Sequence, residues 1–389
     1  MTLNNFQFNT TPGLRFGSSQ AVNSCREIFN KLGSRILFIT DKGLMSLGLT
    51  KPTIEELKKM SSVEIFDDVE ADPSKKTLLK AIEIGKKIKA TGVIGFGGGS
   101  SMDVAKLTAL ILGSNEDLEE AWGVSNAKGP RLPLVLVPTT AGTGSEVTPV
   151  SIITVGEEEK KGVSSAIILP DLAILDPDLT LGLPAGTTAA TGIDAMVHAI
   201  EAYASSSQNN NIISKMLAVE ALKLLGSSIE KAVFDGSNVK ARGNMLVGAM
   251  LAGKAFANSP VAAVHALAYP IGGTFHVSHG LSNSLVLPYV LRFNSVETKA
   301  AKDYAELAPY VFPKIDINKG TQSICAEFID KLEDLSKRLG LPQKLREVDI
   351  PKEACEKMAS DAMKQTRLLV NNPREVTESD ALNIYQSAW

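Results

Sequence analysis

Five short apolar runs between Arg35 and Asp176, separated by segments of helical periodicity, constrain the fold of this 389-residue chain more than any other feature. Most of these runs are apolar at successive positions rather than at alternate ones. Strands of this kind are buried on both faces, which is typical of a parallel sheet covered by helices. The sequence therefore predicts an α/β domain of nucleotide-binding type. The predicted strands are Ile36–Ile39, Val63–Phe66, Val93–Phe96, Leu134–Val137 and Ala173–Leu175.

The pattern changes after Pro184, where long stretches rich in Ala, Leu, Met and Lys follow helical periodicity to the C-terminus. Prolines and a Gly-Gly pair interrupt this region, and we expect them to separate helices because proline lacks a backbone N–H. We predict two domains, an α/β domain over 1–185 and an all-helical domain over 186–389. The predicted helix breakers are Pro260, Pro270, Gly272, Gly273, Pro288, Pro313 and Pro373.

A glycine loop, Gly97–Gly99, directly follows the third predicted strand and precedes a helical pattern. This order places backbone N–H groups and a helix N-terminus against a phosphate, and a side chain in the loop would hold the phosphate off. Ser100 and Ser101 could donate hydroxyl groups or cap the helix, and Asp103 would suit its first turn. Helix capping alone would explain these polar residues without any ligand.

The glycine loop is not the Gly-x-Gly-x-x-Gly fingerprint, and no acidic residue follows it at the expected spacing. Asp41 instead follows the first predicted strand, which would place it at the same carboxyl edge of a parallel sheet. A carboxylate there accepts hydrogen bonds from a ribose 2′-hydroxyl and repels a 2′-phosphate, which favours NAD over NADP. A simple turn before Lys42 and Gly43 is the alternative.

A second polar loop follows the fourth predicted strand and contains Thr139, Thr140, Thr143 and Ser145 with two glycines. Such a loop could wrap a diphosphate or a nicotinamide ribose. Lys160, in the charged run 157–162, could bind a ribose, although such runs are most often solvated hairpin turns.

All four histidines of the chain lie between Gly192 and His279. Asp194 and His198 are four residues apart, so on a helix they share one face and could bind one ion. Taken alone, this pair could arise by chance, but the gathering of every histidine favours a metal site. Three imidazoles and one carboxylate suit Fe(II) or Zn(II) and suit Ca(II) or Mg(II) poorly.

Composition excludes several classes of partner. The net charge of −3 without basic runs gives no footprint for nucleic acid or acidic lipid, so a small-molecule partner fits better. Three dispersed cysteines argue against disulfides and thiolate metal sites, and no apolar run is long enough for a membrane span. Together with an N-terminus unlike a signal peptide, these features predict a cytoplasmic protein that is not membrane-bound.

Several motifs in order resemble the iron-containing (group III) alcohol dehydrogenases. The resemblance reaches from the first strand to Asn372-Pro373-Arg374 and the final Trp389. Its other motifs are Gly97-Gly98-Gly99-Ser100-x-x-Asp103-x-x-Lys106, the run Thr139 to Thr148, Asp194-x-x-x-His198, His265, and His279-Gly280.

The resemblance implies a dehydroquinate-synthase-like fold, with a dinucleotide-binding domain and a helical catalytic domain that associate as a homodimer or larger oligomer. It implies that Asp194, His198, His265 and His279 hold Fe(II), with Zn(II) as the alternative. It also implies a set of cofactor-binding residues. These are Asp41 on the adenosine ribose, Gly98, Gly99, Ser100 and Asp103 near the diphosphate, Thr139, Thr140 and Thr143 along the cofactor, Lys160, and Leu183 near the nicotinamide.

One position departs from the family. Several members carry a histidine, proposed as a proton relay, four residues after the third ligand, where this chain has Tyr269. A neutral phenol is a poor proton acceptor at neutral pH. Either a water and ribose relay suffices without Tyr269, or His276, which the ligand set does not use, takes part.

The expected activity is an NAD(H)-linked interconversion of a small alcohol or diol with its aldehyde or ketone, in which a metal polarises the substrate oxygen. A glycerol dehydrogenase or a hydroxyacid–oxoacid transhydrogenase of the same fold are alternatives. A lyase resembling dehydroquinate synthase is disfavoured because Lys254 is the one basic residue near the ligand motifs. A non-catalytic sensor of metal and nucleotide is a further alternative.

Overall fold

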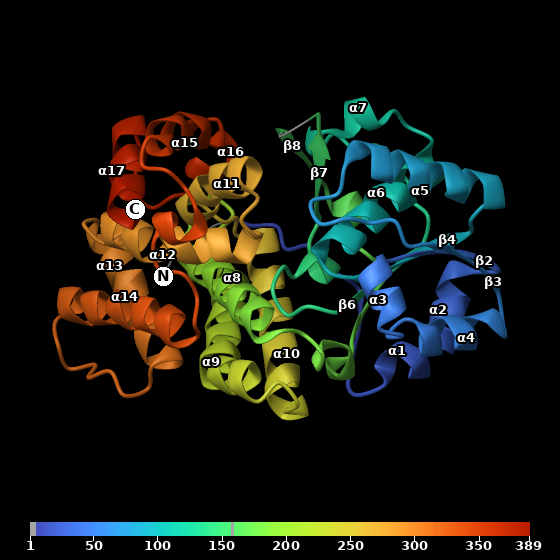
Figure 1. The fold of residues 1–389 in the computed structure, drawn as a ribbon, viewed down its shortest axis with the longest axis horizontal. Coiled ribbons are helices and arrows are strands. Elements are labelled where there is room, and N and C mark those ends of the chain that lie inside the picture. The colour runs from blue at the N-terminus through green and yellow to red at the C-terminus, as the bar shows by residue number, and fades with distance from the viewer. Residues whose placement is uncertain (1–4, 157–158) are drawn as a thin grey trace. The chain divides into compact units, whose positions relative to one another are not determined.

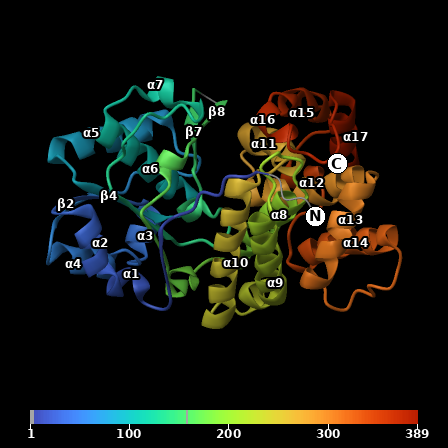
Figure 2. The same ribbon diagram turned by 180° about the vertical axis from the view of Figure 1, so that it is seen from behind.

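The computed structural model describes residues 5–156 and 159–389 and divides into two compact units. Figures 1 and 2 show each unit from opposite sides. One unit is Asn9–Gly182, and the other is Leu183–Trp389 together with the N-terminal segment up to Phe8. The sequence had placed the division between 185 and 186 and had assigned the N-terminal segment to the α/β domain.

A six-stranded parallel sheet forms the centre of the first unit, in the order β1-β9-β6-β4-β2-β3. This confirms the α/β prediction, and all five predicted strands are present. The edge strand β1 was not predicted because only half of its four residues are partly buried, so it lacks a continuous apolar run. The strands are β1 (Gly13–Phe16), β2 (Arg35–Ile39), β3 (Ser62–Phe66), β4 (Gly92–Gly97), β6 (Leu134–Pro138) and β9 (Leu172–Leu175).

Helices cover both faces of this sheet, and neighbouring residues of one strand therefore enter different cores. Leu37 of β2 packs in the core shared with α5 and α6, whereas Phe38 packs in the core shared with α2 and α4. Figures 1 and 2 agree on these two layers. The helices are α1 (Gln20–Asn23), α2 (Cys25–Leu32), α3 (Lys42–Ser46), α4 (Lys51–Lys58), α5 (Lys75–Ile88), α6 (Gly99–Ser114) and α7 (Leu118–Ala121).

A small second sheet has the order β5-β8-β7, formed by β5 (Gly123–Val124), β8 (Glu159–Ser164) and β7 (Val150–Val155). Strands β7 and β8 are antiparallel, with Val155 opposite Glu159, so the charged run lies in a hairpin as expected. Glu157 and Glu158 lie outside the described residues. Lys160 is on β8 itself rather than in the turn. The short 3₁₀ helices of this unit are η1 (Ser145–Val147), η2 (Ala166–Ile168) and η3 (Pro177–Thr180).

The second unit is helical throughout its described residues, as predicted. Helices α8, α9 and α10 lie side by side in both views. Among the described residues, no helix is both long and apolar enough to cross a membrane. The elements are α8 (Ala185–Ala204), α9 (Ile212–Phe234), α10 (Val239–Asn258), α11 (Ala263–Phe275), α12 (His279–Asn294), α13 (Thr298–Val311), α14 (Thr321–Arg338), η4 (Leu345–Val348), α15 (Ala354–Met363), α16 (Thr366–Leu369) and α17 (Glu378–Ala388).

Four of the predicted breakers do not separate helices. Pro270, Gly272 and Gly273 lie inside α11 and Pro288 lies inside α12, so the expectation that they mark helix ends was wrong. A proline inside a helix removes the N–H that would bond the carbonyl four residues earlier, which for Pro270 is that of Ala266. In α11 the buried Tyr385 hydroxyl donates to the carbonyl of Leu267, at 2.6 Å, so a side chain from α17 satisfies a carbonyl in the turn before Pro270.

The N-terminal segment groups with the helical unit through a paired hydrogen bond. The side-chain amide of Asn209 donates to the carbonyl of Gln7 at 2.9 Å and accepts from its N–H at 2.8 Å. Residues 5–10 form no strand in the described chain. A contribution of Phe6–Phe8 to an oligomer stays a prediction.

Candidate active site

The four predicted metal ligands come from three helices of the second unit. Asp194 and His198 lie one turn apart on α8, His265 is on α11, and His279 opens α12. Gly280 allows this arrangement, because a Cβ at that position would lie 2.4 Å from the carbonyl oxygen of Ala190 on α8. The close approach of α12 to α8 places His279 beside Asp194.

The ligand atoms surround one point. The Nε2 atoms of His198, His265 and His279 lie 4.0, 3.9 and 3.7 Å from Oδ1 of Asp194. All four ligand atoms lie within 4.8 Å of one another. Four tetrahedral ligands at ~2.1 Å from a metal are about 3.4 Å apart, so a small contraction would suffice. The residues therefore fit a divalent ion that accepts nitrogen and oxygen ligands.

Glu201, one further turn along α8, fixes the orientation of His265. Its Oε2 lies 2.6 Å from Nδ1 of His265, and its Oε1 accepts the backbone N–H of Val264 at 2.7 Å. Because a carboxylate only accepts hydrogen bonds, Nδ1 carries the proton and the lone pair of Nε2 faces the cluster. The buried Glu201 thus selects the tautomer of His265 that can bind a metal.

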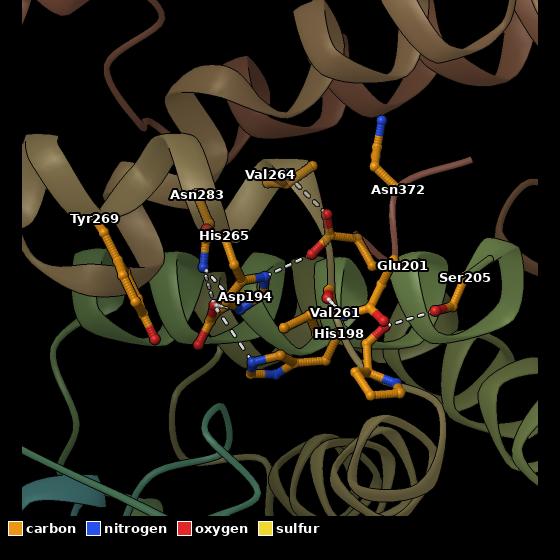
Figure 3. A network of polar contacts seen from close by, with 12 residues as sticks. Asp194, His198, Glu201, Ser205, Val261, Val264, His265, Tyr269, Asn283 and Asn372 are labelled. Carbon is orange, nitrogen blue, oxygen red and sulfur yellow. Dashed lines mark hydrogen bonds and ion pairs between the residues drawn. The ribbon is translucent and has the colours of Figure 1, made fainter. Parts of the chain in front are cut away.

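Asn283, on α12, also contacts the metal-ligand cluster (Figure 3). Its Nδ2 donates to Oδ1 of Asp194 at 2.6 Å and lies 3.3 Å from Nε2 of both His265 and His279. Asn283 is fully buried, and among the described residues its Oδ1 has no hydrogen-bond donor. The amide nitrogen of Asn283, rather than its oxygen, faces the ligand atoms, so Asn283 helps to hold Asp194 beside two of the imidazoles.

The electrostatics of Asp194 favour its charged form. Burial by itself would raise the pKa of Asp194, but the three facing imidazoles and the amide of Asn283 outweigh it and lower the pKa below its usual value. The ring of His198 stacks on Phe256 of α10, with centroids 4.4 Å apart, and on His265 at 4.8 Å. The carboxylate is therefore kept ready to bind a cation, and the imidazole planes are held in place.

The two tentative catalytic residues are placed differently. The Tyr269 ring lies 6.2 Å from the His279 ring, and its hydroxyl accepts a hydrogen bond from Arg367 at 3.1 Å. His276 is exposed, caps the end of α11 with φ of 55°, and is not part of the four-residue cluster. The structure thus brings Tyr269 to the site, whereas a catalytic role for either residue stays a prediction.

The glycine loop forms the start of α6 in the first unit. Gly97 has φ of +154°, Gly98 is the N-cap and Gly99 begins the helix. The alternative in which Ser100 or Ser101 caps the helix is wrong, because Gly98 is the N-cap and both serines lie inside α6. The expectation that Asp103 lies in the first turn is also wrong, because no acidic residue is in that turn. A Cβ at Gly98 would meet only Thr140, at 3.8 Å, among the described residues, so this side of the loop is open to a ligand.

Asp103 takes part in a buried network. Its carboxylate accepts from Ser145 Oγ at 2.7 Å and from the N–H of Ile152 at 2.9 Å. Lys106, fully buried one turn later, donates to Ser145 Oγ at 2.7 Å and to the carbonyl of Val150 at 2.6 Å. Burial lowers the pKa of Lys106 to about 8, partly opposed by Asp103. This network joins α6 to the second polar loop and to β7.

The other predicted cofactor residues have structural partners as well. Asp41 caps α3 by accepting the N–H of Leu44 at 2.9 Å, and it follows β2, which pairs with β4 before the glycine loop. Lys160 pairs with Asp72 at 2.7 Å. The carbonyl of Leu183, in the other unit, accepts from the buried Arg242 at 3.1 Å. Cofactor binding by these residues stays a prediction.

The second polar loop lies beside the glycine loop. The N–H of Thr139 donates to the carbonyl of Gly97 at 2.9 Å, and a Cβ at Gly99 would lie 3.0 Å from the Thr143 side chain. Thr139 is buried, whereas Thr140 and Thr143 are partly exposed. Two predicted cofactor loops therefore meet at one edge of the sheet.

Sequence reasoning missed Glu201, Asn283 and Arg367. Glu201 could have been found, because it is seven residues after Asp194 and three after His198 and so shares their helix face. Asn283 follows His279 by four residues and could have been found in the same way. Arg367 had no such signal, since the fold alone brings it to Tyr269.

Two family models together match most of the chain. Residues 12–177 match the model described as iron-containing alcohol dehydrogenase, and residues 188–389 match the C-terminal model of the Fe-containing alcohol dehydrogenase family.

Individual relatives extend over nearly the whole chain. A long-chain-alcohol dehydrogenase of Geobacillus thermodenitrificans is 40% identical over 370 residues, covering 92% of this chain and 91% of the relative. An alcohol dehydrogenase structure from Oenococcus oeni has a TM-score of 0.94 and 32% identity, covering 99% of this chain and 100% of that one. A sulfoacetaldehyde reductase structure from Bifidobacterium kashiwanohense in complex with NAD+ has a TM-score of 0.86 and 28% identity, covering 99% and 98%.

Proposed function

Because this chain belongs to the iron-containing alcohol dehydrogenase family, we propose that it is an NAD-dependent, Fe(II)-dependent alcohol dehydrogenase. It transfers a hydride between the carbinol carbon of a small alcohol or diol and the nicotinamide of NAD. The observation that carries this proposal is the convergence of Asp194, His198, His265 and His279 on one point.

When bound, a divalent ion at these residues supplies a positive charge that polarises the substrate oxygen and makes the carbinol a better hydride donor. Fe(II) is favoured by the family, and Zn(II) fits the same nitrogen and oxygen donors. Glu201 keeps the Nε2 lone pair of His265 directed at this position. Asn283 holds Oδ1 of Asp194, so the carboxylate keeps one orientation.

Support for NAD comes from the first unit. The open side of Gly98 at the start of the 16-residue helix α6 suits a diphosphate, because helix N-termini favour anions. Asp41 follows the neighbouring strand β2, and a carboxylate there favours a free ribose 2′-hydroxyl over a 2′-phosphate. The relative solved with NAD+ agrees with this choice.

Family membership leaves the substrate open. One relative acts on long-chain alcohols by its name, and another reduces sulfoacetaldehyde. Tyr269 replaces the relay histidine of several family members, so the substrate proton leaves by a path that does not require an imidazole at this position.

The test is a nicotinamide absorbance assay on protein loaded with Fe(II). The substrates are a panel of primary alcohols, diols, aldehydes and 2-oxo acids. We expect NAD-linked turnover that a chelator abolishes and added Fe(II) restores. Absence of cofactor oxidation or reduction with every compound would favour a binding protein over an enzyme.

A further inference from the structure

Of the four proposed metal ligands, His279 alone has a side chain that is substantially exposed to solvent. The side chain of His279 is 43% exposed, whereas those of Asp194, His198 and His265 are 5% exposed or less. A substrate that reaches the cluster therefore passes His279. The Tyr269 ring is next to His279, with the ring centroids 6.2 Å apart.

A cation borders this open side. Arg367 Nη2 donates to the Tyr269 hydroxyl at 3.1 Å, and its guanidinium lies 5.9 Å from the centre of the Tyr269 ring. Its backbone is fixed, because Asn371 Nδ2 donates to the Arg367 carbonyl at 2.9 Å. Arg367 thus lies one side chain away from the ligand residue His279.

Among the described residues, no carboxylate pairs with the guanidinium of Arg367. Within the described chain no Asp or Glu oxygen lies within 4.0 Å of its guanidinium, and its side chain is exposed. This contrasts with Arg292 and Arg338, which each pair with two carboxylates. A guanidinium has five N–H donors in a planar fork that matches carboxylate and sulfonate groups.

We propose that Arg367, oriented by Tyr269, selects substrates that carry an anionic group, such as a carboxylate or sulfonate, away from the reacting carbon. This inference rests on the proposed function. The anionic group takes no part in the reaction. In reduction, NADH transfers a hydride to the carbonyl carbon and the carbonyl oxygen takes up one proton, so the products are NAD+ and the alcohol with its anionic group unchanged.

The test compares succinic semialdehyde with its methyl ester, which differs mainly in charge. We expect wild-type kcat/KM to be about tenfold or more higher for the semialdehyde, since a hydrogen bond between charged groups is worth at least that factor. Arg367→Met should remove this preference by raising KM for the semialdehyde while changing turnover of the ester less than about twofold. Lys364→Met, which removes an exposed charge three residues earlier, should leave the preference intact.

Ionic strength provides a second readout. Salt should raise KM for the semialdehyde in wild type and not in Arg367→Met, because it screens the exposed cation. Equal kcat/KM for both aldehydes in wild type, or equal losses for both in Arg367→Met, would overturn the inference and leave the proposed function standing. No turnover of either aldehyde or of the neutral alcohols would overturn both.

Discussion

Replacing Glu201 by Gln tests whether the tautomer of His265 is set by this carboxylate. Glu201 accepts two hydrogen bonds, from Val264 N–H at 2.7 Å and from His265 Nδ1 at 2.6 Å. Glutamine has one carbonyl oxygen and one NH₂ group, so it can satisfy only one of these donors. If its NH₂ group faces His265, Nδ1 must accept and the proton moves to Nε2, which can then no longer bind a metal.

The expected size of the effect follows from burial. Both side chains are about 4% exposed, so solvent does not replace the lost bond. Removal of a partner of a metal-ligating histidine typically weakens metal binding roughly 10- to 100-fold, which corresponds to about 1.4 to 2.8 kcal/mol. We expect a decrease in this range for Glu201→Gln.

The assay is titration of metal-depleted protein with Co(II) against a competing chelator, followed by the visible absorption of the bound ion. Glu220→Gln on α9 is the control, because Glu220 is half-exposed and pairs only with Lys223 among described residues. The reasoning fails if Glu201→Gln binds Co(II) as tightly as Glu220→Gln.

Three further predictions concern other parts of the chain. Burial lowers the pKa of Lys106 to about 8 in the folded protein, whereas its ordinary pKa in an unfolded chain is near 10.4. Between these two pH values the unfolded chain therefore keeps a proton on Lys106 that the folded protein has lost. The free energy of unfolding should therefore rise by on the order of 3 kcal/mol between these values. Urea unfolding across this pH range should show the rise in wild type, and its persistence in Lys106→Met would contradict the assignment. Tyr385→Phe should lower the free energy of unfolding by about 1–3 kcal/mol, because the buried Leu267 carbonyl loses its donor; an unchanged midpoint in urea would argue against this role. Asp41→Ser keeps a cap for α3 but removes the charge, so kcat/KM for NADP relative to NAD should rise about tenfold, equivalent to roughly 1.4 kcal/mol; an unchanged ratio would exclude Asp41 from the ribose site.

The sheet could be predicted from the sequence because its central strands are apolar on both faces. The same apolar reasoning could not find β1, which is an edge strand with half-exposed residues. Pro270 and Pro288 were misread because packing against other helices keeps α11 and α12 helical through these prolines. The Tyr385 hydroxyl, from more than a hundred residues away, also donates to the Leu267 carbonyl of α11, and no local pattern shows such contacts.

The metal cluster was predicted from two kinds of evidence, residue spacing and family resemblance, and each identified different ligands. Spacing alone pointed to Asp194 and His198, because four residues make one helical turn. The choice of His279 over His276 came from the resemblance to a family, and the structure places His279 in the cluster and His276 outside it. The partners of the cluster depend on contacts between helices, so Arg367 could not be inferred from spacing.

The most direct test of the account is a parallel measurement of bound iron and NAD-linked alcohol oxidation in wild type and His265→Ala. His265 is chosen because it is buried, is held by Glu201 and lies 3.9 Å from Asp194. We predict that wild type retains one equivalent of metal per chain, and that His265→Ala loses both metal and turnover while its circular dichroism is unchanged. Full turnover in a folded His265→Ala protein that retains no metal would contradict the account.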